Sequence, residues 1–222
     1  MRSSSAAFGL AWAAVALICA VGSAAAQAAK ARYPIMAPVE HYRVASPADE
    51  IALARRAAPA SIADAADVLT LGSQGYETAV KGRNGFVCLV WRSWTAGFDD
   101  AEFWNPKLRA PICLNPAAAR SALPAFLERT RWALAGLSKA EMVSRTQATI
   151  AANAYIAPAP GAMAYMMSKR GYLGDAVGHW HPHLRFFLSH TDGKDWGAEL
   201  SGSPVCLWGR AILSPSRPSP YL

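Results

Sequence analysis

Hydrophobic and polar positions along the chain predict one helix, three strands, two more helices and then further strands. The run DVLTLGSQGYETAVKGRNGFVCLVWRSW is rich in β-forming residues. Glycines between Gly72 and Gly75 and the turn RNG at 83–85 divide this run, so it predicts three strands that form a meander. The stretch AMAYMMS predicts a fourth strand, and GHWHPHLRFF heads a fifth.

The first helix has a clear start and a clear end in the sequence. Ser46 can accept a hydrogen bond from the first turn, and Pro47 suits the first helical position. Asp49 and Glu50 add negative charge where the helix dipole is positive. Pro59 then ends the helix, because proline cannot continue it.

Two further helices follow TAGFDDAEFWNPKLRAP, which is predicted to be a loop. Apolar residues then recur every three or four positions, the period of one helix face that packs into a core. These residues are Leu123, Phe126, Leu127, Leu134 and Leu137. The next helix is predicted to begin at Ser138, with Glu141 completing a capping box, and to run to about Ala152.

The order of these elements predicts an α+β fold, because no regular alternation of strand, helix and strand is visible. We expect a single domain with a mostly antiparallel sheet, a meander plus C-terminal strands, and two or three helices packed on it. The predicted divisions are a signal peptide at 1–28, an extended leader at 29–45, the domain at 46–205 and a disordered or aberrant tail at 206–222. The tail is assigned by its change toward Ser, Pro and Arg.

The amino terminus indicates export. Arg2 precedes a long apolar run that ends in small residues, so cleavage after Ala26 or Ala28 is expected. No transmembrane segment is expected after that cleavage, and the mature protein should be secreted or periplasmic.

The chain carries 22 Lys and Arg against 15 Asp and Glu, a formal net charge of +7. Loss of Arg2 with the signal peptide leaves 21 against 15, or +6. The basic residues are scattered rather than gathered into a dense run, so no nucleic-acid partner is expected.

Three cysteines remain after export: Cys88, Cys113 and Cys206. A disulfide between Cys88 and Cys113 would close the aromatic-rich stretch between them into one loop. The alternative is that both are buried thiols that pack as small apolar side chains. No C-x-x-C pair is present, so the usual redox and zinc-ribbon patterns are absent.

Histidines at alternate positions make GHWHPHLRFF the strongest candidate for chemistry. His179, His181 and His183 would project to one side of an extended strand, and Pro182 would confine that strand to an edge. Imidazoles at this spacing can bind a transition metal such as zinc or copper. Asp175 could be a fourth ligand or the acceptor that fixes an imidazole tautomer. The alternative is that the histidines face solvent or form separate hydrogen bonds.

Beyond the histidines, the same strand should have one apolar and one polar face. Leu184, Phe186 and Leu188 should lie on one face, and His183, Arg185 and Phe187 on the other. The histidines and Arg185 could therefore converge on a metal, on an anion or only on water.

Two other groups are weaker candidates. Asp99, Asp100 and Glu102 could supply a ligand or a general base if the fold brings them near the histidines, but their ordinary role is that of solvated loop carboxylates. Met163 and Met167 share a strand face and would suit copper, although methionines on a strand usually fill the core.

The conventional signatures of a nucleophilic serine, a phosphate-binding loop, a zinc protease helix and a dinucleotide fold are all absent. The chain resembles a group of uncharacterised exported bacterial proteins in four stretches: GYETAVKGRNGFVCLV, FDDAEFWNPKLRAPIC, PGAMAYMMSK and GYLGDAVGHWHPHLRFF. The resemblance covers most of 47–205 and implies a shared fold and export, with no activity attached.

Two functions are therefore open. The sequence favours a non-catalytic exported domain with a binding or structural role, in which the histidine motif offers a transition-metal site. The alternative is a secreted metal-dependent hydrolase that uses His179, His181 and His183.

Overall fold

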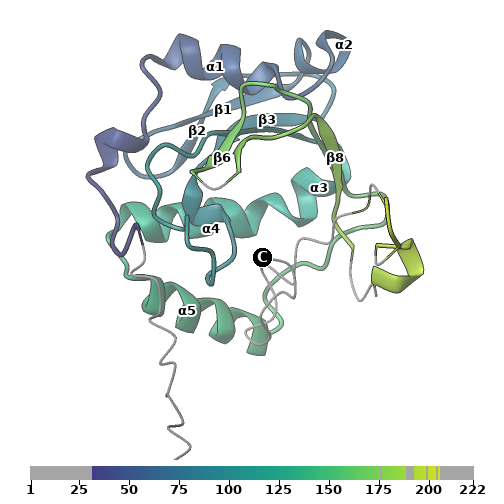
Figure 1. Cartoon of the computed structure of the whole chain (residues 1–222). Helices are drawn as coiled ribbons and strands as arrows, with labels where there is room; N and C mark the ends of the chain where they lie inside the picture. Colours follow the sequence, from purple (N-terminus) through teal and green to yellow (C-terminus); the bar gives the residue numbers. More distant parts are fainter. Residues whose placement is uncertain (1–31, 176, 189–192, 199, 204, 206–222) are drawn as a thin grey trace, which may run out of the picture. The chain divides into compact units, whose positions relative to one another are not determined.

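A six-stranded mixed sheet in the order β2-β1-β3-β4-β5-β8 lies at the centre of the structure (Figure 1). The computed structural model describes residues 32–175, 177–188, 193–198, 200–203 and 205. The strands of this sheet are β1 (Asp67–Leu71), β2 (Tyr76–Val80), β3 (Val87–Trp91), β4 (Ala110–Leu114), β5 (Met163–Met166) and β8 (His183–Phe186). A separate two-stranded sheet contains β6 (Tyr172–Gly174) and β7 (Gly178–His179). The predicted α+β fold with a mostly antiparallel sheet is confirmed.

Helices cover both faces of the sheet. They are α1 (Pro47–Arg55), α2 (Ala60–Ala63), α3 (Pro116–Ser121), α4 (Leu123–Leu134) and α5 (Lys139–Ala151), with short 3-10 helices η1 (Val39–Tyr42), η2 (Ser93–Thr95) and η3 (Gly193–Trp196). The predicted caps are present: Ser46 accepts from the backbone N–H of Asp49, and Ser138 and Glu141 form a capping box. These local hydrogen bonds explain why α1 and α5 begin where they do.

One apolar cluster packs on each face of the sheet. Alanines of α1 and α2 pack on Val68, Cys88 and Val90 of one face. On the other face α3 and α4 pack on Leu89, Trp91 and the alternate residues of β4 and β5. Leu123 and Phe126 are buried as predicted, and α5 packs against α4 (Figure 1).

The first three strands do not form the predicted meander. β1 pairs with β2 antiparallel but with β3 parallel, with Asp67 opposite Val87. Four of the five residues of β3 are buried, whereas the middle three residues of β2 are exposed. A strand buried on both faces belongs inside a sheet, and a polar strand suits its edge, so β3 lies inside and β2 outside.

β4 begins within the segment predicted to be a loop. All five residues of β4 are buried, and Pro111 lies opposite Val90 of β3. The apolar run APICL is short and has no alternation, which is typical of a strand buried on both faces.

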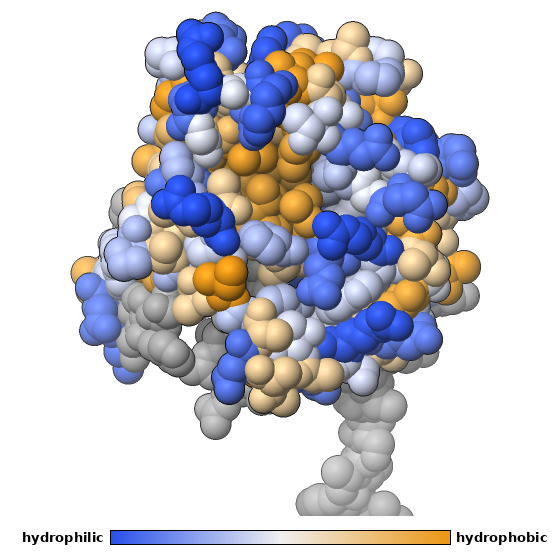
Figure 2. All heavy atoms as spheres, turned by 180° about the vertical axis from the view of Figure 1, so that it is seen from behind, coloured by the Kyte–Doolittle hydropathy of each residue, from blue (hydrophilic) through white to orange (hydrophobic). Residues whose placement is uncertain are grey.

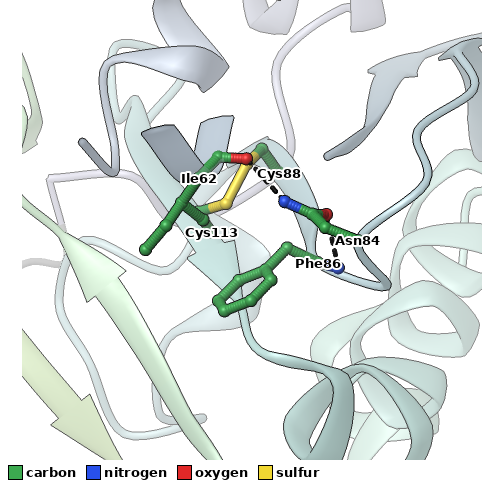
Figure 3. The surroundings of a disulfide bond; sticks show 5 residues. All are labelled: Ile62, Asn84, Phe86, Cys88 and Cys113. Atoms are coloured by element: carbon green, nitrogen blue, oxygen red, sulfur yellow. Dashed lines mark hydrogen bonds between the residues drawn. A yellow bond between two sulfur atoms is a disulfide. The ribbon is translucent and has the colours of Figure 1, made fainter. Parts of the chain in front are cut away.

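The disulfide between Cys88 and Cys113, one of the two alternatives left open by the sequence, is present and links β3 to β4 where the two residues are directly opposed. Figure 3 shows it beside the Phe86 ring and the end of α2. The Asn84 side chain donates to the Ile62 carbonyl at 2.8 Å and accepts from the Phe86 N–H at 3.1 Å. The disulfide and this asparagine therefore stabilise the same corner of the fold.

Residues 32–45, predicted as an extended leader, are packed against the domain. Tyr42 is fully buried, and its hydroxyl donates to the Trp104 carbonyl at 2.8 Å. The Arg92 Nε donates to the Tyr42 carbonyl at 2.6 Å.

The predicted signal peptide at 1–28 and tail at 206–222 lie outside the described residues. None of the helices in the described part of the chain has the length and apolarity needed to cross a bilayer.

Candidate functional site

The histidine motif does not form a single strand. His179 ends β7 in the small sheet, whereas His183 begins β8 at the edge of the main sheet. Between them Trp180 is buried, and its indole N–H donates to the Ser168 carbonyl at 2.9 Å. Burial of this large ring and the missing N–H of Pro182 end one strand before the next begins. The expectation that the three histidines project to one side of one strand is therefore wrong.

Two of the imidazoles hydrogen-bond to the backbone. His179 Nδ1 lies 2.9 Å from the Gly171 carbonyl oxygen, and His183 Nδ1 lies 2.7 Å from that of His181. Because a carbonyl oxygen only accepts, the Nδ1 atom of each ring is the donor in these contacts. The Tyr172 ring packs edge-on against His179.

The described residues contain no group of three or more His, Cys, Asp and Glu side chains that could hold a metal ion. Met163 lies on the opposite face of the sheet from His183, because His183 is opposite Met166 in the register. The Met163 thioether and the His183 imidazole are therefore not on one face.

Asp175 is engaged by four donors from three segments of the chain. It accepts a hydrogen bond from the Tyr172 hydroxyl and another from the Tyr33 hydroxyl at 2.5 Å. Arg32 Nη1 and Lys107 Nζ lie 2.9 Å and 3.3 Å from its oxygens. The two tyrosine hydrogen bonds hold the pKa of Asp175 well below its usual range. Its carboxylate therefore joins segments of the fold and does not contact an imidazole.

The acidic loop does approach Asp175, although not through its side chain. The Asp175 backbone N–H donates to Glu102 Oε1 at 2.9 Å, and Asn105 Nδ2 donates to Glu102 Oε2 at 2.5 Å. Asp100 accepts from the Glu102 N–H at 2.7 Å, and burial raises its pKa. Asp99 is exposed. These carboxylates shape their own loop and support the β6–β7 turn.

The residues of β8 alternate as predicted, but the polar set faces the core. His183 and Arg185 lie opposite Met166 and Ala164, which are buried under α3 and α4. The Arg185 guanidinium carbon lies 5.4 Å from the centre of the Trp91 ring and 5.6 Å from that of Phe187. An arginine can lie inward here because its stem is apolar and aromatic faces attract its charge.

Arg185 and Trp91 form a pair of donors without acceptors. The Trp91 Nε1 atom is buried and has no hydrogen-bond partner in the described structure. The Arg185 guanidinium likewise has no ion pair or hydrogen bond to any described residue. Burial alone lowers the pKa of Arg185 to about 10, so it stays charged at neutral pH. Trp91 Nε1 is a buried donor without a partner, and Arg185 beside it is a half-buried cation without an acceptor, so the pair indicates a place where a ligand could bind.

Aromatic rings surround this donor pair. Trp91 packs on Phe126 with 4.2 Å between ring centres, and Phe126 meets Phe187 edge-on. The His183 ring lies edge-on to Trp180 at 5.1 Å. The alternation of β8 pointed to Arg185, whereas Trp91 had no local signal, because its role depends on contact with a strand that is 94 positions away.

A hollow of about 220 Å³ lies between α4 and the residues after α5. It is lined by Ser121, Pro124, Ala125, Glu128, Arg131, Ala154, Tyr155 and Ile156. It carries charges of both signs, and none of its lining side chains is a buried polar group without a partner. It is therefore a weaker candidate than the Trp91 and Arg185 pair.

Comparisons with known proteins were negative: no protein-family model, no curated protein and no solved structure matches the chain. The candidate site stands on the geometry of Trp91, His183 and Arg185.

Proposed function

We propose that the protein is an exported, non-catalytic binding domain that takes a small carboxylate ligand on the inner face of β8. Arg185 and the Trp91 N–H are the donors, and the rings of Phe187 and Trp180 provide apolar surface beside them. The observation that carries the proposal is that these two donors lie together without acceptors.

A carboxylate fits both donors. A guanidinium binds carboxylates through charge-assisted hydrogen bonds, and an indole N–H can donate to an acceptor nearby. The buried Trp91 N–H left without a partner costs roughly 1–3 kcal/mol, which a bound acceptor would recover. The surrounding rings favour a ligand with an apolar body, so an aromatic acid such as benzoate is a suitable probe.

A binding role fits the state of Asp175 and Glu102 better than a catalytic one. Asp175 is held by four donors, and Glu102 accepts from the backbone of Asp175 and from Asn105. A general base needs a carboxylate free to take a proton from substrate. These acids are occupied by structural contacts instead.

Export is supported by the disulfide between Cys88 and Cys113, because disulfides persist in oxidising compartments. The predicted signal peptide would direct the chain to the secretion pathway. We place the mature protein in the periplasm or outside the cell, where it would meet small organic acids.

The test is calorimetric titration of the mature protein with benzoate and with benzamide, its neutral analogue. We expect benzoate to bind and benzamide to bind at least tenfold more weakly, since the charge-assisted hydrogen bonds are lost. Arg185→Met should weaken benzoate binding by about tenfold or more, and Trp91→Phe, which removes the N–H, should weaken it by less.

Arg145→Met is the matched control, because Arg145 is an exposed arginine on α5 and should leave benzoate binding unchanged. Equal binding of benzoate by the Arg185→Met protein and the unmodified protein would refute the proposal. Circular dichroism of each variant establishes that it is folded before titration.

A further inference from the structure

The outer face of β8 and of the two residues that follow it carries three exposed apolar side chains at the edge of the sheet. Leu184, Phe186 and Leu188 are 45%, 54% and 45% exposed. On the neighbouring strand Met163 lies opposite Phe186 and Tyr165 lies opposite Leu184, which extends this apolar row. Within the described structure β8 pairs on one side only, with β5.

Exposed apolar side chains also occur elsewhere, for example at Ile35 and Ile156. Figure 2 shows a hydrophobic patch framed by hydrophilic side chains on the face seen from behind. The β8 row differs because it stands on a strand edge. An edge presents backbone N–H and C=O groups to another strand, and apolar side chains beside it favour that pairing.

We propose that two copies of this chain pair through β8, antiparallel, with a two-fold axis at Phe186. The two six-stranded sheets would then form one continuous sheet across the axis. This inference is independent of the proposed ligand site, which lies on the inner face of the same strand.

The sequence of β8 is complementary to itself in this register. An axis at Phe186 sets Leu184 opposite Leu188 of the second copy and Phe186 opposite its own copy, so the outer face pairs apolar with apolar. On the inner face it sets Arg185 opposite Phe187. Aromatic and apolar cross-strand pairs of this kind stabilise a sheet.

The two registers with the axis nearer the start of β8 are less favourable. A two-fold axis relating antiparallel strands of one sheet keeps outer residues opposite outer residues, so the axis passes through a residue. An axis at Arg185 would set the two guanidinium groups opposite each other, and like charges in that position are destabilising. An axis at Leu184 would set His183 opposite Arg185, which places two basic side chains together.

Cysteine crosslinking tests both the partner and the register. In a Cys206→Ser background, Phe186→Cys should form a disulfide-linked dimer on mild oxidation, because directly opposed residues lie about 4.5–5.5 Å apart at Cα. Leu184→Cys alone should not form this dimer. Residue 184 of one copy lies opposite residue 188 of the other, so the two cysteines at 184 would be four residues, roughly 13 Å, apart along the strand. A mixture of Leu184→Cys and Leu188→Cys proteins should crosslink.

Sedimentation equilibrium of the unmodified mature protein gives the second measurement. We expect a dimer, which Phe186→Lys should convert to a monomer, while Ile156→Lys should leave the dimer intact as the control for a charge at another exposed apolar site. If the unmodified protein is monomeric at every concentration, the proposal is overturned, and another segment or partner must cover the edge of β8. Equal crosslinking of the Leu184→Cys and Phe186→Cys proteins overturns the register. If Phe186→Lys fails to fold, the crosslinking results decide whether the dimer forms through β8.

Discussion

The Tyr33 hydroxyl donates a hydrogen bond of 2.5 Å to Asp175, although 142 positions separate the two residues. The contact ties the first described residues to the turn of the β6–β7 sheet. It raises the pKa of Tyr33 to about 12, with the hydrogen bond to Asp175 as the largest cause. The stabilisation that this hydrogen bond provides should therefore decrease at alkaline pH.

Tyr33→Phe should reduce the loss of stability at high pH. The folded-state pKa of about 12 lies above the ordinary value of about 10, so the contribution of Tyr33 is complete below pH 10 and is lost as pH rises through 12. We expect Tyr33→Phe to lower the free energy of unfolding at neutral pH and to flatten its fall between pH 10 and 12. Urea denaturation at a series of pH values measures both.

Tyr165→Phe is the control for removing a phenol, because the Tyr165 hydroxyl has no hydrogen bond to any described residue. Its alkaline profile should match that of the unmodified protein. An unchanged slope in Tyr33→Phe would mean that the Asp175 contact does not contribute in solution.

Loss of the disulfide should be one of the most destabilising changes available. Cys88 and Cys113 are fully buried and close a loop with a sequence separation of 25. In the chain-entropy description a crosslink of this span stabilises by about 3 kcal/mol. We expect the Cys88→Ala, Cys113→Ala double variant to lose that amount in urea denaturation. Cys206→Ser should change little, and a loss below about 1 kcal/mol in the double variant would contradict the assignment.

Element ends were predictable because their causes are local. Ser46 and Ser138 cap helices through hydrogen bonds within three residues, and a sequence shows such spacing directly. The disulfide was one of two predicted alternatives, and the pairing of β3 with β4 decided between them by placing Cys88 opposite Cys113.

The placement of strands and their faces was not predictable in the same way. Periodicity shows that His183 and Arg185 share a face, but not that this face meets Ala164 and Met166 in the core. Similarly, the sequence of β1, β2 and β3 does not show that the polar strand β2 lies at the edge and that β3 pairs with β1 on the other side. The facing of β8 and the order of these strands both depend on long-range packing, which favours the arrangement that buries more apolar surface.

A buried arginine on α4 gives a prediction about stability. Arg129 is 3% exposed, and its three guanidinium nitrogens have no hydrogen-bond partner in the described structure. It packs on Phe98 with 3.8 Å from the guanidinium carbon to the ring centre, and burial lowers its pKa to about 9. An unpaired buried charge costs several kcal/mol, whereas stacking on an aromatic ring recovers about 2.

Arg129→Met should therefore raise the free energy of unfolding by about 1 kcal/mol, because it keeps the apolar stem and removes the charge. Arg131→Met, an exposed site on the same helix, should stay within about 0.5 kcal/mol of the unmodified protein. A marked loss of stability in Arg129→Met would mean that the guanidinium has a partner in solution.

Metal analysis decides what the three histidines do. His179 and His183 belong to different sheets, and each uses Nδ1 to bond a backbone carbonyl. Since this arrangement does not direct the two imidazoles to one point, we expect substoichiometric zinc and copper in protein purified without a histidine tag. A variant with all three residues, His179, His181 and His183, changed to Ala should contain the same amount, and so should His41→Ala. One equivalent of metal in the unmodified protein that disappears only in the triple variant would instead establish a metal site built on the motif.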